Sequence, residues 1–80
     1  MNVQKSTAYL HNKKAVTNTF IIKKVKDIDQ LFNNAINDAK TFASFRGGNI
    51  HITRTTNSLY INYLDVKDCT LIDHTYLINK

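Results

Sequence analysis

A cysteine, two histidines and three aspartates offer the residue types of a nucleophilic active site. Cys69 is the single cysteine of the chain, and with His51 or His74 and a carboxylate it could form a nucleophile, a base and an orienting acid. The aspartates nearest to it in sequence are Asp65, Asp68 and Asp73. However, a cysteine that opens a strand beside leucine and isoleucine is more often a small buried hydrophobic residue. No catalytic motif surrounds these residues, so a small enzyme or toxin is the third of three hypotheses.

Metal and phosphate motifs are also lacking. The soft ligands His11, His51, His74 and Cys69 do not stand at the spacing of a zinc site. Gly47-Gly48 follows a predicted helix, whereas a phosphate loop precedes one. The aspartate-rich stretch 65–68 contains a lysine and is typical of an ordinary turn. The sequence therefore predicts no catalytic residues, no metal and no cofactor.

Charge is the strongest compositional signal. The 80 residues carry eleven Lys and Arg against six acids, a formal net charge of +5. Residues 1–26 hold six lysines and no acid, whereas residues 27–80 are close to neutral. This asymmetry favours a polyanionic partner, either nucleic acid or an acidic protein surface, although it also serves solubility. Nine of the eleven are lysines, which contact phosphates without bidentate base readout, so little sequence preference is expected.

An amphipathic helix is predicted from about Ile28 to Phe45. Its start is indicated by Asp27 as N-cap with Gln30 three residues later, and its end by Gly47-Gly48. Apolar residues recur at helical spacing at positions 28, 31, 32, 35, 36, 39, 42 and 43.

Extended segments lie on both sides of this helix. Strands are predicted at 5–10 and 16–24, joined by a polar turn at 11–14, and then at 49–55, 59–64 and 69–74, with 75–80 extending the last strand or fraying. Short connections favour hairpins. We therefore predict a single α+β domain over residues 1–80: ββαβββ, a mainly antiparallel five-stranded sheet packed on a single amphipathic helix. One helix covers one face, so the other face and an edge strand stay open, and a homodimer is one way to cover them.

Basic and aromatic residues on the open face form the predicted binding surface. Alternation places Lys23, His51 and Tyr60 on the face away from the helix, where an aromatic ring among cations stacks bases. Tyrosines on an open sheet are also favourable cross-strand pairs without a ligand. The complete set of predicted partner-binding or nucleic-acid-binding residues is Lys13, Lys14, Lys23, Lys24, Lys26, Arg46, Arg54, Tyr60 and His51.

Composition also bears on location and source. No apolar run approaches the roughly 18 residues of a membrane span, and the first ten residues lack the apolar core of a signal peptide. The expectation is a cytoplasmic protein without a membrane partner. Ten Asn, nine Ile and nine Lys are residues of A/T-rich codons, which favours a low-GC bacterium or its phage as the source.

The organisation of the chain resembles the small phage anti-CRISPR proteins. Some of these fold as a curved five-strand sheet wrapped on one helix, in the same two-strand, helix, three-strand order. The similarity runs from Ala8 to His74 and includes FIIKKVKDIDQLFNNAINDAKTFASFRGG, NIHITRT, NSLYINYLD and DCTLIDH. It is a likeness of architecture, length and composition, without a diagnostic motif. It implies a non-catalytic inhibitor that docks on a CRISPR effector in the host cytoplasm and blocks DNA or guide access.

Many members of that group are acidic and imitate DNA, whereas this chain is basic. The resemblance then implies binding to an acidic protein patch, or to nucleic acid exposed in a ribonucleoprotein complex. The first hypothesis is therefore a phage or mobile-element inhibitor of a host CRISPR-type complex. The second is a small module that binds DNA or RNA directly with little sequence specificity.

Overall fold

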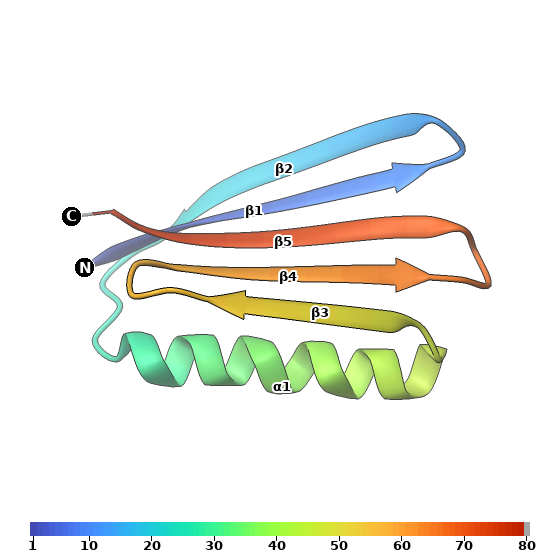
Figure 1. Cartoon of the computed structure of the whole chain (residues 1–80). Helices are drawn as coiled ribbons and strands as arrows, with labels where there is room; N and C mark the ends of the chain where they lie inside the picture. Colours follow the sequence, from blue (N-terminus) through green and yellow to red (C-terminus); the bar gives the residue numbers. More distant parts are fainter. Residues whose placement is uncertain (80) are drawn as a thin grey trace.

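The computed structural model describes residues 1–79 and contains one five-stranded sheet and one helix (Figure 1). The elements in chain order are β1 (Asn2–His11), β2 (Lys14–Ile22), α1 (Ile28–Arg46), β3 (Asn49–Arg54), β4 (Ser58–Asp65) and β5 (Thr70–Asn79). All neighbouring strands are antiparallel, and their order in the sheet is β2-β1-β5-β4-β3. The predicted α+β class and element order are confirmed. Lys80, at the end of the predicted tail, lies outside the described residues.

Both ends of α1 are set by residues that satisfy free backbone groups. The Asp27 side chain accepts a hydrogen bond from the Gln30 N–H at 3.0 Å. At the other end, Gly47 adopts a φ of 74°, and its N–H donates to the Ala43 carbonyl at 2.7 Å. These are the usual N-cap and left-handed C-cap of a helix. The predicted helix is confirmed, with Arg46 added at its end.

Strict alternation along the strands puts one face of the sheet under the helix. On β4, Leu59 and Ile61 are almost completely buried, whereas Tyr60 between them is exposed. Phe32 of α1 is fully buried against this face, and its ring meets that of Tyr76 edge to face at 6.1 Å. We call this the helix side of the sheet, and the opposite face the outer face. The core therefore forms between α1 and the helix side of the sheet.

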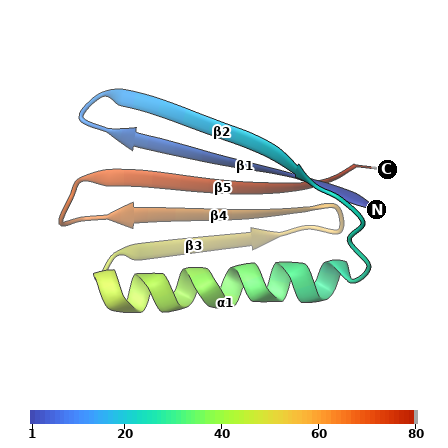
Figure 2. The ribbon, with the colours of Figure 1, turned by 180° about the vertical axis from the view of Figure 1, so that it is seen from behind.

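The helix covers only part of its side of the sheet. Figures 1 and 2 show α1 running along β3 and β4, while the β1–β2 hairpin extends away from it. As a result, every residue of β2 except Ile22 is exposed, including Val16 and Phe20 on the helix side. Both faces of β2 are therefore open to solvent.

Several strand boundaries differ from the sequence prediction, and β2 runs over 14–22 rather than 16–24, which leaves Lys23 and Lys24 outside it. β1 begins at Asn2 rather than at position 5, because it lies between β2 and β5 and both neighbours hold its polar first residues in the ladder. β5 begins at Thr70 rather than Cys69, because Cys69 adopts a φ of 51° in the preceding turn. The cysteine is exposed, so its interpretation as a buried strand residue is wrong.

Candidate interaction surface

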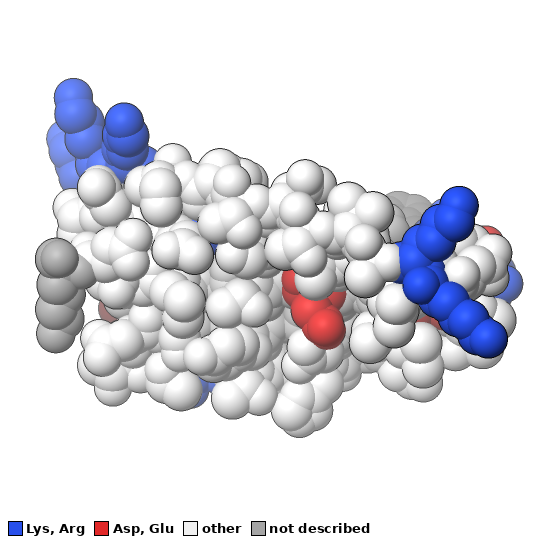
Figure 3. Space-filling model, turned by 90° about the horizontal axis from the view of Figure 1, so that it is seen from above, with Lys and Arg blue, Asp and Glu red and all other residues white. Residues whose placement is uncertain are grey.

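Five of the predicted binding lysines gather in two groups at opposite ends of β2. Lys13 and Lys14 form the tip of the β1–β2 hairpin, where positive φ angles at Asn12 (49°) and Lys13 (65°) make a two-residue turn. Lys23, Lys24 and Lys26 follow the other end of β2. A nine-residue strand separates the groups by about 30 Å. Figure 3, which looks down on the β2 edge, shows basic residues at both ends and, between them, a surface that is uncharged apart from an acidic patch near its middle.

Arg46 is held within the fold by two aspartates of the β4–β5 turn. Its Nη2 lies 2.7 Å from Asp65 Oδ2 and its Nε donates to the same oxygen at 3.1 Å, while Nη2 also donates to Asp68. The Asp65 side chain is only 4% exposed. The hydrogen bond from Arg46 holds the pKa of Asp65 below its usual value, aided by the backbone N–H groups of Asp68 and Lys67. This arginine thus links the C-terminal end of α1 to the β4–β5 turn.

Arg54 is engaged in the same way at the opposite end of the helix. Its guanidinium pairs with Asp29 of α1 and lies over the Phe32 ring, 5.2 Å from the ring centroid. A cation over a buried aromatic ring is stabilising without any external partner. Both arginines therefore have internal roles that their positions in the sequence do not reveal.

The outer face carries the predicted His51 and Tyr60, but within residues 1–79 no lysine or arginine of the five strands lies on it, because Lys5, Lys14 and Arg54 fall on the helix side. His51 pairs across β3–β4 with Asn62, and Tyr60 with Thr53, so the two aromatic residues lie next to each other on this face. The acidic side chain there, Asp73, accepts a hydrogen bond from Asn62 at 2.6 Å. About half of the other residues on this face are Thr, Ser and Asn, and the remainder includes a cross-strand row of Leu10, Leu71 and Leu64. The structure therefore separates the aromatic residues from the lysines. Lys23, which alternation was expected to place on this face, instead lies just after the last residue of β2.

A groove on the helix side contains two residues that the sequence analysis did not select as binding residues. Its volume is about 270 Å³, and Lys5, His74 and Asp38 of α1 line it together with mainly apolar and aromatic residues of α1 and the sheet. The Lys5 ammonium lies 5.3 Å from the centroid of the Tyr76 ring and 5.8 Å from that of Phe20. His74 Nδ1 lies 3.2 Å from the Thr7 hydroxyl oxygen. Burial lowers the pKa of His74, and Lys5 lowers it further. The sequence signal that could have identified Lys5 is its spacing of two residues from the apolar Val3, which places both side chains on the same face of β1.

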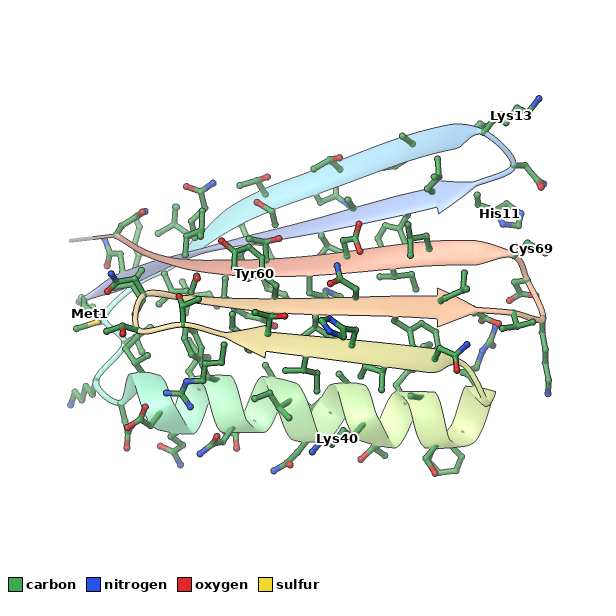
Figure 4. All side chains as sticks on the ribbon, viewed as in Figure 1. Met1, His11, Lys13, Lys40, Tyr60 and Cys69 are labelled. Carbon is green, nitrogen blue, oxygen red and sulfur yellow. The ribbon has the colours of Figure 1, made fainter. Side chains whose placement is uncertain are left out.

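The residues of the catalytic hypothesis are dispersed. His51 lies on the outer face and His74 on the helix side, so the sheet separates them. Cys69 lies in the β4–β5 turn, at the same end of the molecule as His11 and Lys13 (Figure 4). His11 Nδ1 is engaged with the Thr70 hydroxyl at 2.7 Å. Within residues 1–79, no group of three or more His, Cys, Asp or Glu side chains has the geometry of a metal site.

Comparisons of the chain with protein-family models, with curated proteins and with solved structures give no significant match. In the part of the chain that the structure describes, α1 is too polar to serve as a membrane-spanning helix. The features that bear on function are therefore those of the surface, above all the charged side chains that have no partner within the fold.

Proposed function

We propose that this protein is a non-catalytic binding protein that docks on a host CRISPR-type nucleic-acid-processing complex and inhibits it stoichiometrically. One observation carries the proposal: the arginines form ion pairs within the fold, whereas the lysines at the two ends of β2 do not. All three ion pairs within residues 1–79 belong to Arg46 and Arg54. The five lysines at the two ends of β2 have no carboxylate partner among these residues. Their charge is therefore available to an acidic or phosphate-bearing partner.

This assignment narrows the surface predicted from the sequence. The lysine groups at the ends of β2 are its main contacts, whereas Arg46 and Arg54 act inside the fold. Tyr60 and His51 form a separate patch without lysine or arginine on the outer face, suited to packing rather than to binding a phosphate backbone. An exposed hairpin with cations at both ends fits a large partner better than a small substrate, because it presents a long exposed edge rather than an enclosed pocket.

The spacing of the two lysine groups sets the scale of the target. About 30 Å is close to one turn of duplex DNA, roughly 34 Å. A single strand edge laid along a duplex or heteroduplex would thus place each group near a phosphate backbone. Lysines neutralise phosphates as point charges and carry little base preference. Inhibition would follow from occupying the backbone contacts that a nuclease needs, not from reading a sequence.

A nuclease inhibition assay with a matched charge control tests the proposal. CRISPR-type nucleases of low-GC bacteria are assayed with the purified protein in excess, as wild type and as the pair Lys13→Glu/Lys14→Glu. The control pair Lys40→Glu/Lys67→Glu changes net charge equally but alters exposed lysines of α1 and of the β4–β5 turn. We expect the hairpin-tip pair to weaken inhibition at least about tenfold and the control pair less than about twofold, because only the former removes contacts. Full activity of every tested nuclease in excess protein would refute the proposal.

The second candidate function, direct binding of DNA or RNA, is supported by the same unpaired lysines. Fluorescence anisotropy at several salt concentrations distinguishes the two functions. Direct binding to duplex DNA through five phosphates predicts a slope of about −4.5 for log K against log salt. Absence of binding at low salt, together with inhibition of a nuclease, would assign the lysines to an acidic protein surface.

A further inference from the structure

The β2 strand is an edge that residues 1–79 leave uncovered, independently of the function proposed above. Eight of its nine residues are exposed, with Val16 at 55% and Phe20 at 52% of their surface. At the opposite edge, by contrast, Ile50 and Ile52 of β3 are packed into the core beside the helix. The β2 segment 15–22 has no charged residue, no proline and no break in its ladder. Natural edge strands normally carry one of those features to prevent pairing.

The hairpin turn fixes which backbone groups of β2 point outward. A two-residue turn is closed by a hydrogen-bonded pair, here His11 and Lys14, and such pairs then alternate along the ladder. Even-numbered residues of β2 therefore bond to β1. The outward N–H and C=O groups, eight in all, belong to the odd-numbered residues Ala15, Thr17, Thr19 and Ile21.

We propose that a second copy of this chain pairs with this edge, β2 against β2 and antiparallel, with the twofold axis at Asn18. This register places Thr17 opposite Thr19 of the second copy and Ala15 opposite Ile21. All eight outward groups of each copy are then hydrogen-bonded, because both pairs are of the bonded type. Displacing the register by two residues would leave Ala15 or Ile21 opposite a turn or loop residue. Asn18 is also the midpoint of the nine-residue strand.

The side chains of β2 are complementary to themselves about the same axis. On the helix side, Val16 of each copy faces Phe20 of the other, and both are exposed in the single chain. On the outer face, Thr17 faces Thr19. Aromatic with β-branched, and threonine with threonine, are favourable cross-strand pairs. The partner is therefore a second copy of this chain rather than an unrelated strand, since the order of apolar and polar residues from 15 to 21 is the same in both directions about Asn18.

Pairing also brings together the two lysine groups that lie about 30 Å apart in one chain. Lys13 and Lys14 of one copy meet Lys23 and Lys24 of the other, so each end of the interface carries a single basic cluster. Like charges repel, and salt screens them. We therefore expect dimerisation to strengthen as salt rises, the opposite of an interface held by ion pairs.

Site-specific crosslinking tests the position of the axis. In a Cys69→Ser background, Asn18→Cys would place two Cα atoms about 4.5 Å apart across a non-bonded pair, within the range of a disulfide. Ala15→Cys is the matched control, because it removes no large side chain and the two copies of position 15 are offset by six residues, about 20 Å along the strand. Under mild oxidation we expect a covalent dimer at least about tenfold faster from position 18 than from position 15.

Sedimentation equilibrium of the wild-type chain at 50 and 500 mM NaCl gives the second measurement. We expect a monomer–dimer equilibrium with a dissociation constant several-fold lower at the higher salt. Mixing Val16→Lys with Phe20→Glu chains should restore the dimer that each single variant weakens, because position 16 of one copy faces position 20 of the other. A monomeric mass at all concentrations, equal crosslinking at both positions, or a dimer without crosslinking at position 18 would each overturn the proposal.

Discussion

Replacing Gly48 with alanine is expected to destabilise the fold much more than replacing its neighbour Gly47. The two glycines join α1 to β3 but have different surroundings. A Cβ at Gly48 would overlap the carbonyl oxygen of Leu64 and the end of the Tyr63 ring, whereas a Cβ at Gly47 would meet nothing within 4 Å. Leu64 pairs with Asn49 in the β3–β4 ladder, so its carbonyl cannot retreat without opening the sheet. The cost at Gly48 is therefore steric.

The two costs differ in size as well as in cause. Overpacking against fixed atoms costs about 1–3 kcal/mol, and the backbone oxygen puts Gly48→Ala at about 3 kcal/mol. Gly47 has a φ of 74°, and a left-handed conformation costs an alanine about 1 kcal/mol. In a domain of this size each kcal/mol lowers Tm by about 4–8 °C. We expect Gly48→Ala to melt at least about 12 °C below wild type, and Gly47→Ala about 5 °C below.

The stability of both variants is measured by thermal melts followed by circular dichroism. Urea titrations then compare their free energies of unfolding, provided that the slope of this free energy against urea concentration is the same. Gly47→Asn is the control, because asparagine tolerates the left-handed region, and it should lose less than Gly47→Ala. Equal losses of unfolding free energy at the two glycines, or a larger loss at Gly47, would show that β4 does not approach the connection between α1 and β3 as closely as described.

Four other outcomes are expected. The pKa of Asp65 is lowered in the fold, so the stability it provides is present above its usual value near 4 and is lost as pH falls below it; Asp65→Asn should flatten this acid limb in urea titrations. The pKa of His74 is also lowered, so stability should fall as pH drops below about 6.5, and His74→Gln should remove that slope. Lys13 has a φ of 65° in the hairpin turn, so Lys13→Gly should raise the free energy of unfolding by about 1 kcal/mol, whereas a loss would contradict the left-handed turn. Alanine at Cys69, His51 or His74 should leave nuclease inhibition unchanged, whereas abolished activity would support the enzyme or toxin hypothesis.

Local patterns predicted the elements of this fold because their causes are local. The helix was visible from the apolar spacing and from Asp27 and Gly47, which act within one turn of its ends. The alternation in β3 and β4 correctly predicted which residues share a face, such as His51 and Tyr60. Strand order was not predictable in this way. β1 pairs with β5 across the full length of the chain, and no short-range signal specifies that partner.

The candidate surface was harder to predict, because a charge is available only when no distant residue uses it. Arg46 and Arg54 have the same appearance in the sequence as any exposed arginine, yet their partners Asp65 and Asp29 lie 19 and 25 residues away. Conversely, the open state of β2 depends on α1 ending up over the other half of the sheet. Sequence reasoning therefore selected these lysines as candidates, but it could not show that the fold leaves them without carboxylate partners among the described residues.

Salt acts with opposite sign on the two proposals, and this makes them separable. Phosphate contacts by lysines weaken as salt rises, since counterion release is lost. Pairing of β2 with β2 strengthens, since repulsion between Lys13 and Lys23 of opposite copies is screened. A polyanion that bridges the joined lysine clusters would remove the same repulsion, so it should drive dimerisation at low salt. Binding curves taken below and above the dimer dissociation constant should therefore differ most at low salt and converge as salt is added. If the two lysine groups instead act separately on one chain, the curves would coincide at every salt concentration.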